Sequence, residues 1–128
     1  MTRRAALLAA AVIFAIEIAI ALFVRGGIVR HTIGDALAAM LVAFVLYACA
    51  MRAPQAAFAS FGIAALIETA QAAGIAEALG LEGAARIAFG ATFDWRDLLA
   101  YAAGAGTFFL IARRAGRRGA PSPSAAPR

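Results

Sequence analysis

Charged residues, cysteine and histidine are scarce in this sequence, and each shortage excludes a class of protein or site. Only 15% of the 128 residues are charged and 64% are hydrophobic, whereas about a quarter of the residues in a soluble domain are charged. The single cysteine, Cys49, excludes an internal disulfide and a metal cluster built from thiols. The single histidine, His31, has no second histidine or cysteine at helical spacing. We therefore predict no metal site and no cofactor.

Lysine is absent, and all twelve basic residues are arginines. A net charge of +5 would otherwise suggest nucleic acid as a partner. The arginines form no patch interleaved with aromatic residues, and they stand at the ends of apolar runs, as the topology signals of membrane proteins do. The sequence therefore predicts a lipid bilayer as the partner and no binding of nucleic acid.

Four apolar runs predict an all-α fold, an integral-membrane four-helix bundle in residues 1–112. A helix of about 20 residues, at 1.5 Å per residue, spans the roughly 30 Å hydrocarbon core of a bilayer. The first run is longer than the apolar core of a cleaved signal peptide, about 7 to 15 residues, so we interpret it as a retained anchor. The four predicted spans are about 5–24, 35–51, 56–74 and 95–112.

Two segments of the chain are too polar to cross a membrane. Residues 75–90 contain three glycines, two glutamates and an arginine, and we predict a short interfacial helix between the third and fourth spans. Residues 113–128 are basic and rich in proline and serine. Such a segment cannot bury a core, so it is predicted to be a disordered cytoplasmic tail.

The distribution of arginines predicts the orientation. Eight arginines fall on one side of the four spans and four on the other, so the positive-inside rule places both termini in the cytoplasm. We predict a multi-pass protein of the bacterial inner membrane. All seven acidic residues then lie in the outer loops, at the outer helix ends or in the outer half of the membrane.

The third predicted span carries a carboxylate and an amide one helical turn apart, Glu68 and Gln71. Its five strongly apolar residues contribute only about −2 kcal/mol to insertion, whereas one central acid costs roughly 2.5 to 3.5 kcal/mol. An acid inside a membrane almost always faces the bundle interior or a water-filled cavity. We therefore predict that residues 56–74 form the central helix, surrounded by the other three spans.

Three aspartates stand where helices are predicted to begin, and each has a structural as well as a functional interpretation. Thr32 followed by Asp35 has the spacing of a capping box. Asp94 can cap the fourth span, with Asp97 in its first turn. Asp97 shares a helical face with Tyr101 and can instead belong to a ligand site.

The candidate site lies at the outer mouth of the bundle. Glu17 and Glu68 lie at similar depth on the two outward-running spans, and the other two spans begin at this side. Glu68 and Asp97 are predicted to be catalytic, as groups that give or accept protons. The residues predicted to bind a ligand are Glu17, Arg30, Asp35, Gln71, Arg86, Asp94 and Tyr101.

These residues form a recognisable series, in which the last block, G-x-T-F-D-W-x-D-L-x-x-Y-x-x-G from Gly90 to Gly104, is the most specific. The series resembles a small bacterial membrane family, domain of unknown function 2809, over roughly residues 10–112, and is distantly similar to the VanZ-like proteins. Those relatives also pair an E-x-x-Q helix with an arginine and a final helix bearing an aspartate. Where they carry an asparagine, this chain has Tyr101. The resemblance implies a fold and a site but no substrate. The earlier members of the series are Glu17, Arg30, Gly34, Asp35, Tyr47, Arg52, Glu68, Gln71 and Arg86.

The sequence leaves two classes of function open, and with them the question of whether the protein is an enzyme. In the first, the site binds or processes a lipid-linked or cell-envelope molecule, with arginines on an anionic headgroup. In the second, the protein is a structural or accessory subunit whose polar residues only lock helices together. A transporter is less favoured, because four spans without an inverted repeat enclose little pathway. A dimer would enclose more, so a homo-oligomer stays open.

Overall fold

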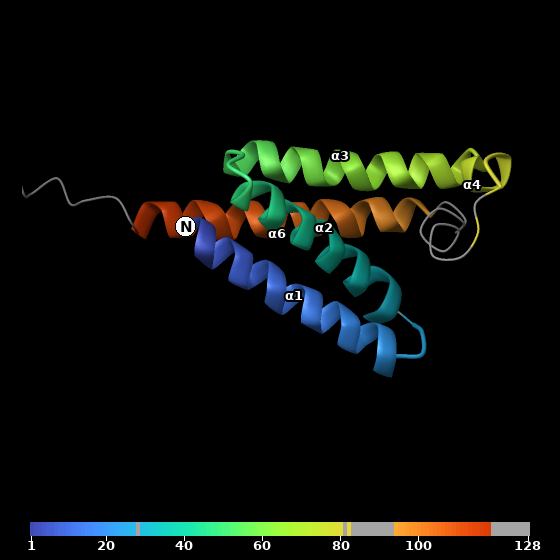
Figure 1. Ribbon diagram of the computed structural model, residues 1–128, viewed down its shortest axis with the longest axis horizontal. Helices are drawn as coiled ribbons and strands as arrows, with labels where there is room; N and C mark the ends of the chain where they lie inside the picture. Colours follow the sequence, from blue (N-terminus) through green and yellow to red (C-terminus); the bar gives the residue numbers. More distant parts are fainter. Residues whose placement is uncertain (28, 81, 83–93, 119–128) are drawn as a thin grey trace, which may run out of the picture.

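The computed structural model describes residues 1–27, 29–80, 82 and 94–118, and all regular structure in these residues is helical (Figure 1). The predicted all-α fold is confirmed. Four long helices run alternately in opposite directions (Figure 1). The elements in chain order are α1 (Arg3–Phe23), the π-helical turn η1 (Val29–Ile33), α2 (Gly34–Ala48), α3 (Ala53–Ala72), the short α4 (Ile75–Ala78) and α6 (Trp95–Arg118).

Side-chain oxygens satisfy backbone N–H groups where α1 and α3 begin. The Thr2 hydroxyl accepts a hydrogen bond from the backbone N–H of Ala5, at 3.2 Å. The Gln55 side chain accepts one from the backbone N–H of Arg52, also at 3.2 Å. Pro54 lies in the first turn of α3, where a missing N–H costs nothing.

A tight turn joins α2 to α3. Ala50 has a positive φ of 77°, and its N–H donates to the Tyr47 carbonyl, at 3.1 Å. The N–H of Met51 donates to the Leu46 carbonyl, at 3.2 Å. This pair of bonds is a Schellman motif, which satisfies the last carbonyls of α2 and reverses the chain.

The helices lie close to the predicted spans, with a clear difference at the end of the chain. α6 continues to Arg118 instead of ending at Ala112, so residues 113–118 are helical and not part of a disordered tail. Arginine is a good helix former. The positive side chains in the last turns of α6 also interact favourably with the negative end of the helix dipole. Of the predicted interfacial segment, α4 and the residues up to Gly80 are described. Most of the rest of that segment, and residues 119–128, lie outside the described residues.

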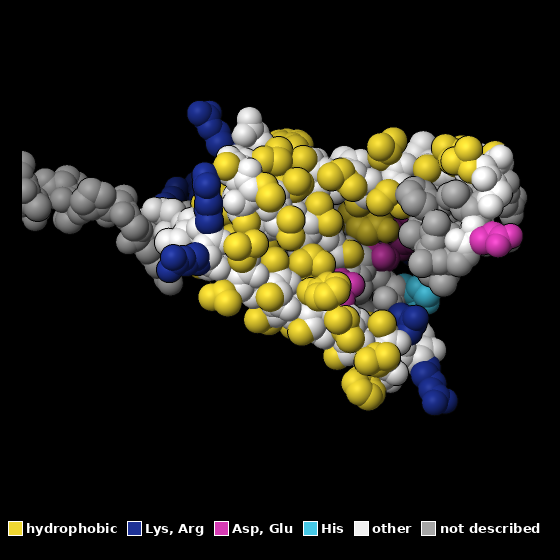
Figure 2. Space-filling model, in the orientation of Figure 1, with side chains coloured by type: hydrophobic (Ala, Val, Ile, Leu, Met, Phe, Trp, Pro, Cys, Tyr) yellow, Lys and Arg dark blue, Asp and Glu magenta, His cyan; other side chains and the backbone are white. Residues whose placement is uncertain are grey.

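Two helical segments are long and apolar enough to cross a membrane, namely Arg3–Phe23 and Arg30–Ala48. α3 and α6 have 20 and 24 residues and are also long enough, but they carry more polar and charged side chains. Large apolar side chains cover much of the surface (Figure 2). The most exposed are Phe23 at 81%, Phe58 at 79% and Leu22 at 71%.

The central helix of the bundle is α2, and the prediction that residues 56–74 are central was wrong. α2 contacts α1, α3 and α6, whereas α1 packs along α2 alone among the long helices of the described structure. α2 can have three neighbours because it carries small alanine side chains, such as Ala36, Ala39 and Ala43, on several of its faces. Small side chains let neighbouring helices approach closely. Glu68 of α3 accepts a hydrogen bond from the backbone N–H of Asp94, the residue before α6, and this bond does not require α3 to contact α1.

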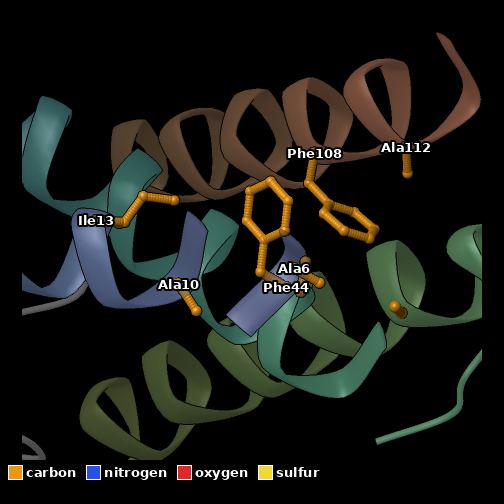
Figure 3. Packing of buried hydrophobic residues seen from close by; sticks show 8 residues of the cluster. Ala6, Ala10, Ile13, Phe44, Phe108 and Ala112 are labelled. Carbon is orange, nitrogen blue, oxygen red and sulfur yellow. The ribbon is translucent and has the colours of Figure 1, made fainter. Parts of the chain in front are cut away.

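The apolar core occupies the end of the bundle where α1 and α3 begin and α2 and α6 end, which we call the basic end. Phe44 of α2 meets Phe108 of α6 edge to face, with ring centroids 4.9 Å apart (Figure 3). Around this pair the core consists mainly of alanines, so the helices approach closely. The exposed arginines of this end are Arg3, Arg4, Arg52, Arg113, Arg114 and Arg117, and Figure 2 shows dark blue side chains gathered there.

Gly104 determines how closely α6 approaches α2. A Cβ atom built on Gly104 would collide with the backbone carbonyl of Ala36, so only glycine fits this contact. A Cβ atom on the nearby Gly106 would meet nothing within 4 Å. The two glycines therefore have different roles on the same helix.

We expect Gly104→Ala to destabilise the protein by about 1 to 3 kcal/mol, because the added methyl group overpacks a backbone contact. Gly106→Ala is the matched control and should be neutral or stabilising by up to about 1 kcal/mol through helix propensity. Thermal unfolding in detergent measures both. Equal unfolding temperatures for the two variants would show that α2 and α6 do not meet at Gly104.

Candidate functional site

Asp35 of α2 and Asp97 of α6 form the centre of an acidic cluster at the end of the bundle opposite the basic end. The Asp35 carboxyl group interacts directly with the side chains of Asp97 and Tyr101. Glu17 and Glu68 contribute further negative charge at Asp35 from α1 and α3. All four long helices thus bring a carboxyl group to one region.

The positions of the acids on their helices explain how they are tolerated together. Asp35 and Asp97 both lie in the first turn of a helix. The positive end of the helix dipole stabilises a negative charge there by about 0.3 to 1 kcal/mol at an exposed site. α2 and α6 run in the same direction (Figure 1), so their positive ends meet where the carboxyl groups converge.

A small cavity of about 140 Å³ adjoins the acidic cluster, between α2, α3 and α6. Asp35 and Tyr101 line it on one side and Ser60 of α3 on the other. Ser60 is buried and its hydroxyl donates to the Ala57 carbonyl, at 2.9 Å. The remaining walls are apolar, so the cavity offers a few polar groups in an otherwise dry surrounding.

Asp35 does not cap α2, and the predicted capping box with Thr32 was wrong. Thr32 lies inside η1, and the residue that precedes α2 is Ile33, which makes no side-chain cap. The chain enters α2 through this π-helical turn, so the first N–H groups of α2 do not need the Asp35 carboxylate. Its side chain is instead directed to Asp97 and Tyr101.

Asp94, in contrast, has the capping role that the sequence predicted. Its Oδ1 accepts a hydrogen bond from the backbone N–H of Arg96, at 2.9 Å, just inside α6. No such bond ties Asp97 to the backbone in the described structure. The two aspartates of this motif therefore separate into a cap, Asp94, and a member of the acidic cluster, Asp97.

Glu68 holds the beginning of α6 against α3. Its side chain is 1% exposed, and Oε1 accepts a hydrogen bond from the backbone N–H of Asp94, at 2.8 Å. A buried carboxylate requires such partners, as the sequence analysis expected of an acid in this span. Asp97 comes three residues after Asp94, so this bond also positions Asp97. Glu68 thus lies beside the acidic cluster and orients one of its members.

Glu17 lies on α1 and faces the same cluster. One of its carboxyl oxygens, Oε1, is shielded from solvent and has no hydrogen-bond partner within the described residues. A shielded acceptor without a partner is unfavourable by about 1 to 3 kcal/mol. Glu17 is therefore the member of the cluster with unused hydrogen-bonding capacity.

Of the two arginines predicted to bind a ligand, Arg30 is described, and within the described structure its hydrogen bonds go to backbone carbonyls and not to the acids. The Arg30 guanidinium donates to the Ala21 and Val24 carbonyls, at 3.1 and 2.9 Å, and so caps the end of α1. Arg96 is exposed, and its guanidinium carbon lies 6.0 Å from the centroid of the Trp95 ring. Arg86 lies outside the described residues. Gln71 is partly buried near the end of α3.

The family comparison covers most of the residues of this site. The family described as "Protein of unknown function (DUF2809)" matches residues 24–105. The chain belongs to this family. No curated protein and no solved structure matches the chain. The DUF2809 match confirms the resemblance inferred from the sequence, and it spans every predicted site residue except Glu17.

The chemistry available to this DUF2809 site is that of hydrogen-bond acceptors and of the proton that two carboxyl groups in direct contact share. Ionised carboxylates only accept hydrogen bonds, and Tyr101 and Ser60 add hydroxyl groups. Within the described residues, no three side chains of His, Cys, Asp or Glu are placed to hold a metal ion. Ser60 was not predicted as a site residue, although it precedes Glu68 by two helical turns on the same face. That spacing was the signal that could have identified it.

We expect Glu68→Leu to lower the free energy of unfolding by about 1 to 3 kcal/mol, because it leaves the Asp94 N–H buried without an acceptor. Glu68→Gln should remain close to the wild type, since an amide oxygen can replace Oε1. Thermal unfolding in detergent compares the three proteins. A Leu variant as stable as the wild type would exclude the bond between α3 and α6.

Proposed function

We propose that this protein spans the bacterial inner membrane four times, with both termini in the cytoplasm and the acidic cluster towards the outer face. The arginine distribution, two apolar helices of spanning length and the exposed apolar surface support this topology. α3 and α6 complete it as more polar spans, and their polar groups meet each other and α2 inside the bundle.

At the acidic cluster we propose a site that binds the polar head of a lipid-linked or cell-envelope molecule. The observation that carries this proposal is the contact of Asp35 with Asp97 and Tyr101 at the wall of a cavity. Neighbouring carboxylates repel each other, and a ligand that brings an amine or hydroxyl groups relieves this repulsion and supplies donors. The ligand head would therefore be rich in hydrogen-bond donors. An anionic head bound by arginines is less well supported.

If the site is catalytic, Asp97 is the residue that would give or accept a proton, with Asp35 and Tyr101 adjusting its acidity. Glu68 would then act as a positioning residue through its bond to Asp94. Glu17, with an unpartnered oxygen, would be a further acceptor for the ligand.

The second candidate is an accessory subunit whose polar groups only hold helices together. The bond from Asp94 to Glu68 and the cap at Asp94 favour this alternative, because both are local structural interactions. The two candidates differ in whether charge matters at Asp35 and Asp97.

For topology, we expect a periplasm-active reporter fused after Arg118 to be silent and a cytoplasm-active reporter at the same position to be active. The reason is the eight-to-four division of arginines between the two sides. Reporters fused in the loop after Ala78 should give the opposite pattern. An active periplasmic reporter after Arg118 would contradict the four-span topology.

For the site, we expect Asp35→Asn and Asp97→Asn to leave the protein folded and abundant but to abolish complementation of the deletion phenotype. The matched control is Asp94→Asn, because asparagine caps a helix as well as aspartate does and function should be retained. Mass spectrometry of molecules that co-purify with each variant provides a second readout. The ligand should be present with wild type and Asp94→Asn and absent from the other two variants.

Full function in both Asp35→Asn and Asp97→Asn, at normal abundance, would contradict the binding site. The accessory-subunit alternative would then be preferred. Loss of abundance in these variants would likewise assign the acids to folding and favour that alternative.

A further inference from the structure

An apolar groove of about 380 Å³ lies between α3 and α6. Its volume is within the range of small-ligand pockets, roughly 300 to 1,000 Å³. Phe58 at its edge is 79% exposed, and a Cβ atom on Gly106 would meet nothing within 4 Å, so the protein's own side chains leave it unfilled. The main walls are Pro54, Phe58 and Phe61 of α3 and Ala102, Gly106 and Phe109 of α6.

The groove opens at the basic end beside two exposed arginines. Arg52 immediately precedes α3 and comes two residues before Pro54. Arg113 follows Phe109 by one helical turn and Gly106 by two, so it continues the groove face of α6. α3 begins and α6 ends at this end of the bundle (Figure 1), which places both arginines at the same mouth.

The charge at this mouth is of one sign. In the described structure none of the acidic residues lies at the basic end, and six exposed arginines do. A second copy of the chain placed against this groove side by side would bring two sets of arginines together, which is unfavourable. An apolar chain attached to a negative head matches both the groove and its mouth.

We propose that the groove binds an acyl chain of an anionic phospholipid of the cytoplasmic leaflet, with Arg52 and Arg113 on the lipid phosphate. Guanidinium groups bind phosphate oxygens through charge-assisted hydrogen bonds. This inference uses the four-span topology proposed above but not the acidic cluster, which lies at the other end of the bundle. An experiment that contradicts one of the two sites therefore leaves the proposal for the other unaffected.

Native mass spectrometry of the full chain, titrated in detergent with dioleoyl phosphatidylglycerol or dioleoyl phosphatidylcholine, tests the charge requirement. Each juxtamembrane arginine contributes about 1 kcal/mol to binding of anionic lipid, which is roughly a 5-fold change in affinity. The double variant Arg52→Gln/Arg113→Gln should thus bind phosphatidylglycerol about 25-fold more weakly and phosphatidylcholine unchanged. The cap at Arg52 uses its backbone N–H and survives the substitution.

The matched control for charge is Arg3→Gln/Arg4→Gln. It removes two arginines from the same end, but on α1, which contacts neither α3 nor α6 in the described structure. Phosphatidylglycerol binding should change less than 3-fold, below the roughly 5-fold effect of one contacting arginine. An equal loss in both double variants would show a diffuse positive surface without a site and overturn the proposal.

The groove itself is tested by Gly106→Leu, whose side chain enters open space. This variant should fold normally and bind phosphatidylglycerol at least 5-fold more weakly, a change comparable with losing one contacting arginine. Gly62→Leu, at an exposed glycine of α3 outside the groove, should bind as the wild type does. Unchanged binding by Gly106→Leu, or a wild-type dimer that this variant dissociates, would overturn the proposal. Asp97→Asn should leave phosphatidylglycerol binding unchanged.

Discussion

The close contact of α6 with α2 at Gly104 is the constraint on which the rest of the structure depends. No side chain separates the two backbones where Gly104 meets Ala36. Tyr101 and Asp97 lie one and two turns before Gly104 on α6, and they can therefore reach Asp35. The same approach brings Phe108 against Phe44 one turn later. One small residue thus aligns the acidic cluster and the aromatic core on the same pair of helices.

The bundle divides along its length into two chemically different halves. The basic half buries alanines and aromatic rings, and its helices are held by close packing. The other half collects carboxyl groups at the positive ends of α2 and α6 and holds them with a few hydrogen bonds. Packing therefore provides rigidity at one end, and polar groups that are costly to bury are concentrated at the other, where ligand binding can compensate for them.

Hydrogen bonds to the main chain divide the polar residues of this site into two kinds. Glu68, Asp94 and Arg30 each bind backbone groups at a helix end, where donors or acceptors lack intrahelical partners. Asp35 and Asp97 contact each other through side chains instead. Residues of the first kind stabilise helix ends, and the side chains of the second kind are not used in that way. The family motif contains both kinds, so membership in the family alone does not separate them.

The sequence by itself determined the helices, the cap at Asp94 and the gathering of acids at one end, because these depend on periodicity, local capping and the alternating direction of successive helices. It did not determine which helix is central, since Glu68 marks an interior position on its own helix but does not specify the number of neighbours. Of the two interpretations of Asp35, the capping box was wrong, and the bonds of Arg30 to the α1 carbonyls were not foreseen, because the π-helical turn and those carbonyls are brought near these residues only by folding. Which of several polar groups meet depends on contacts between residues far apart in the chain, and those are decided by the packing of α2 against α6 at a single glycine.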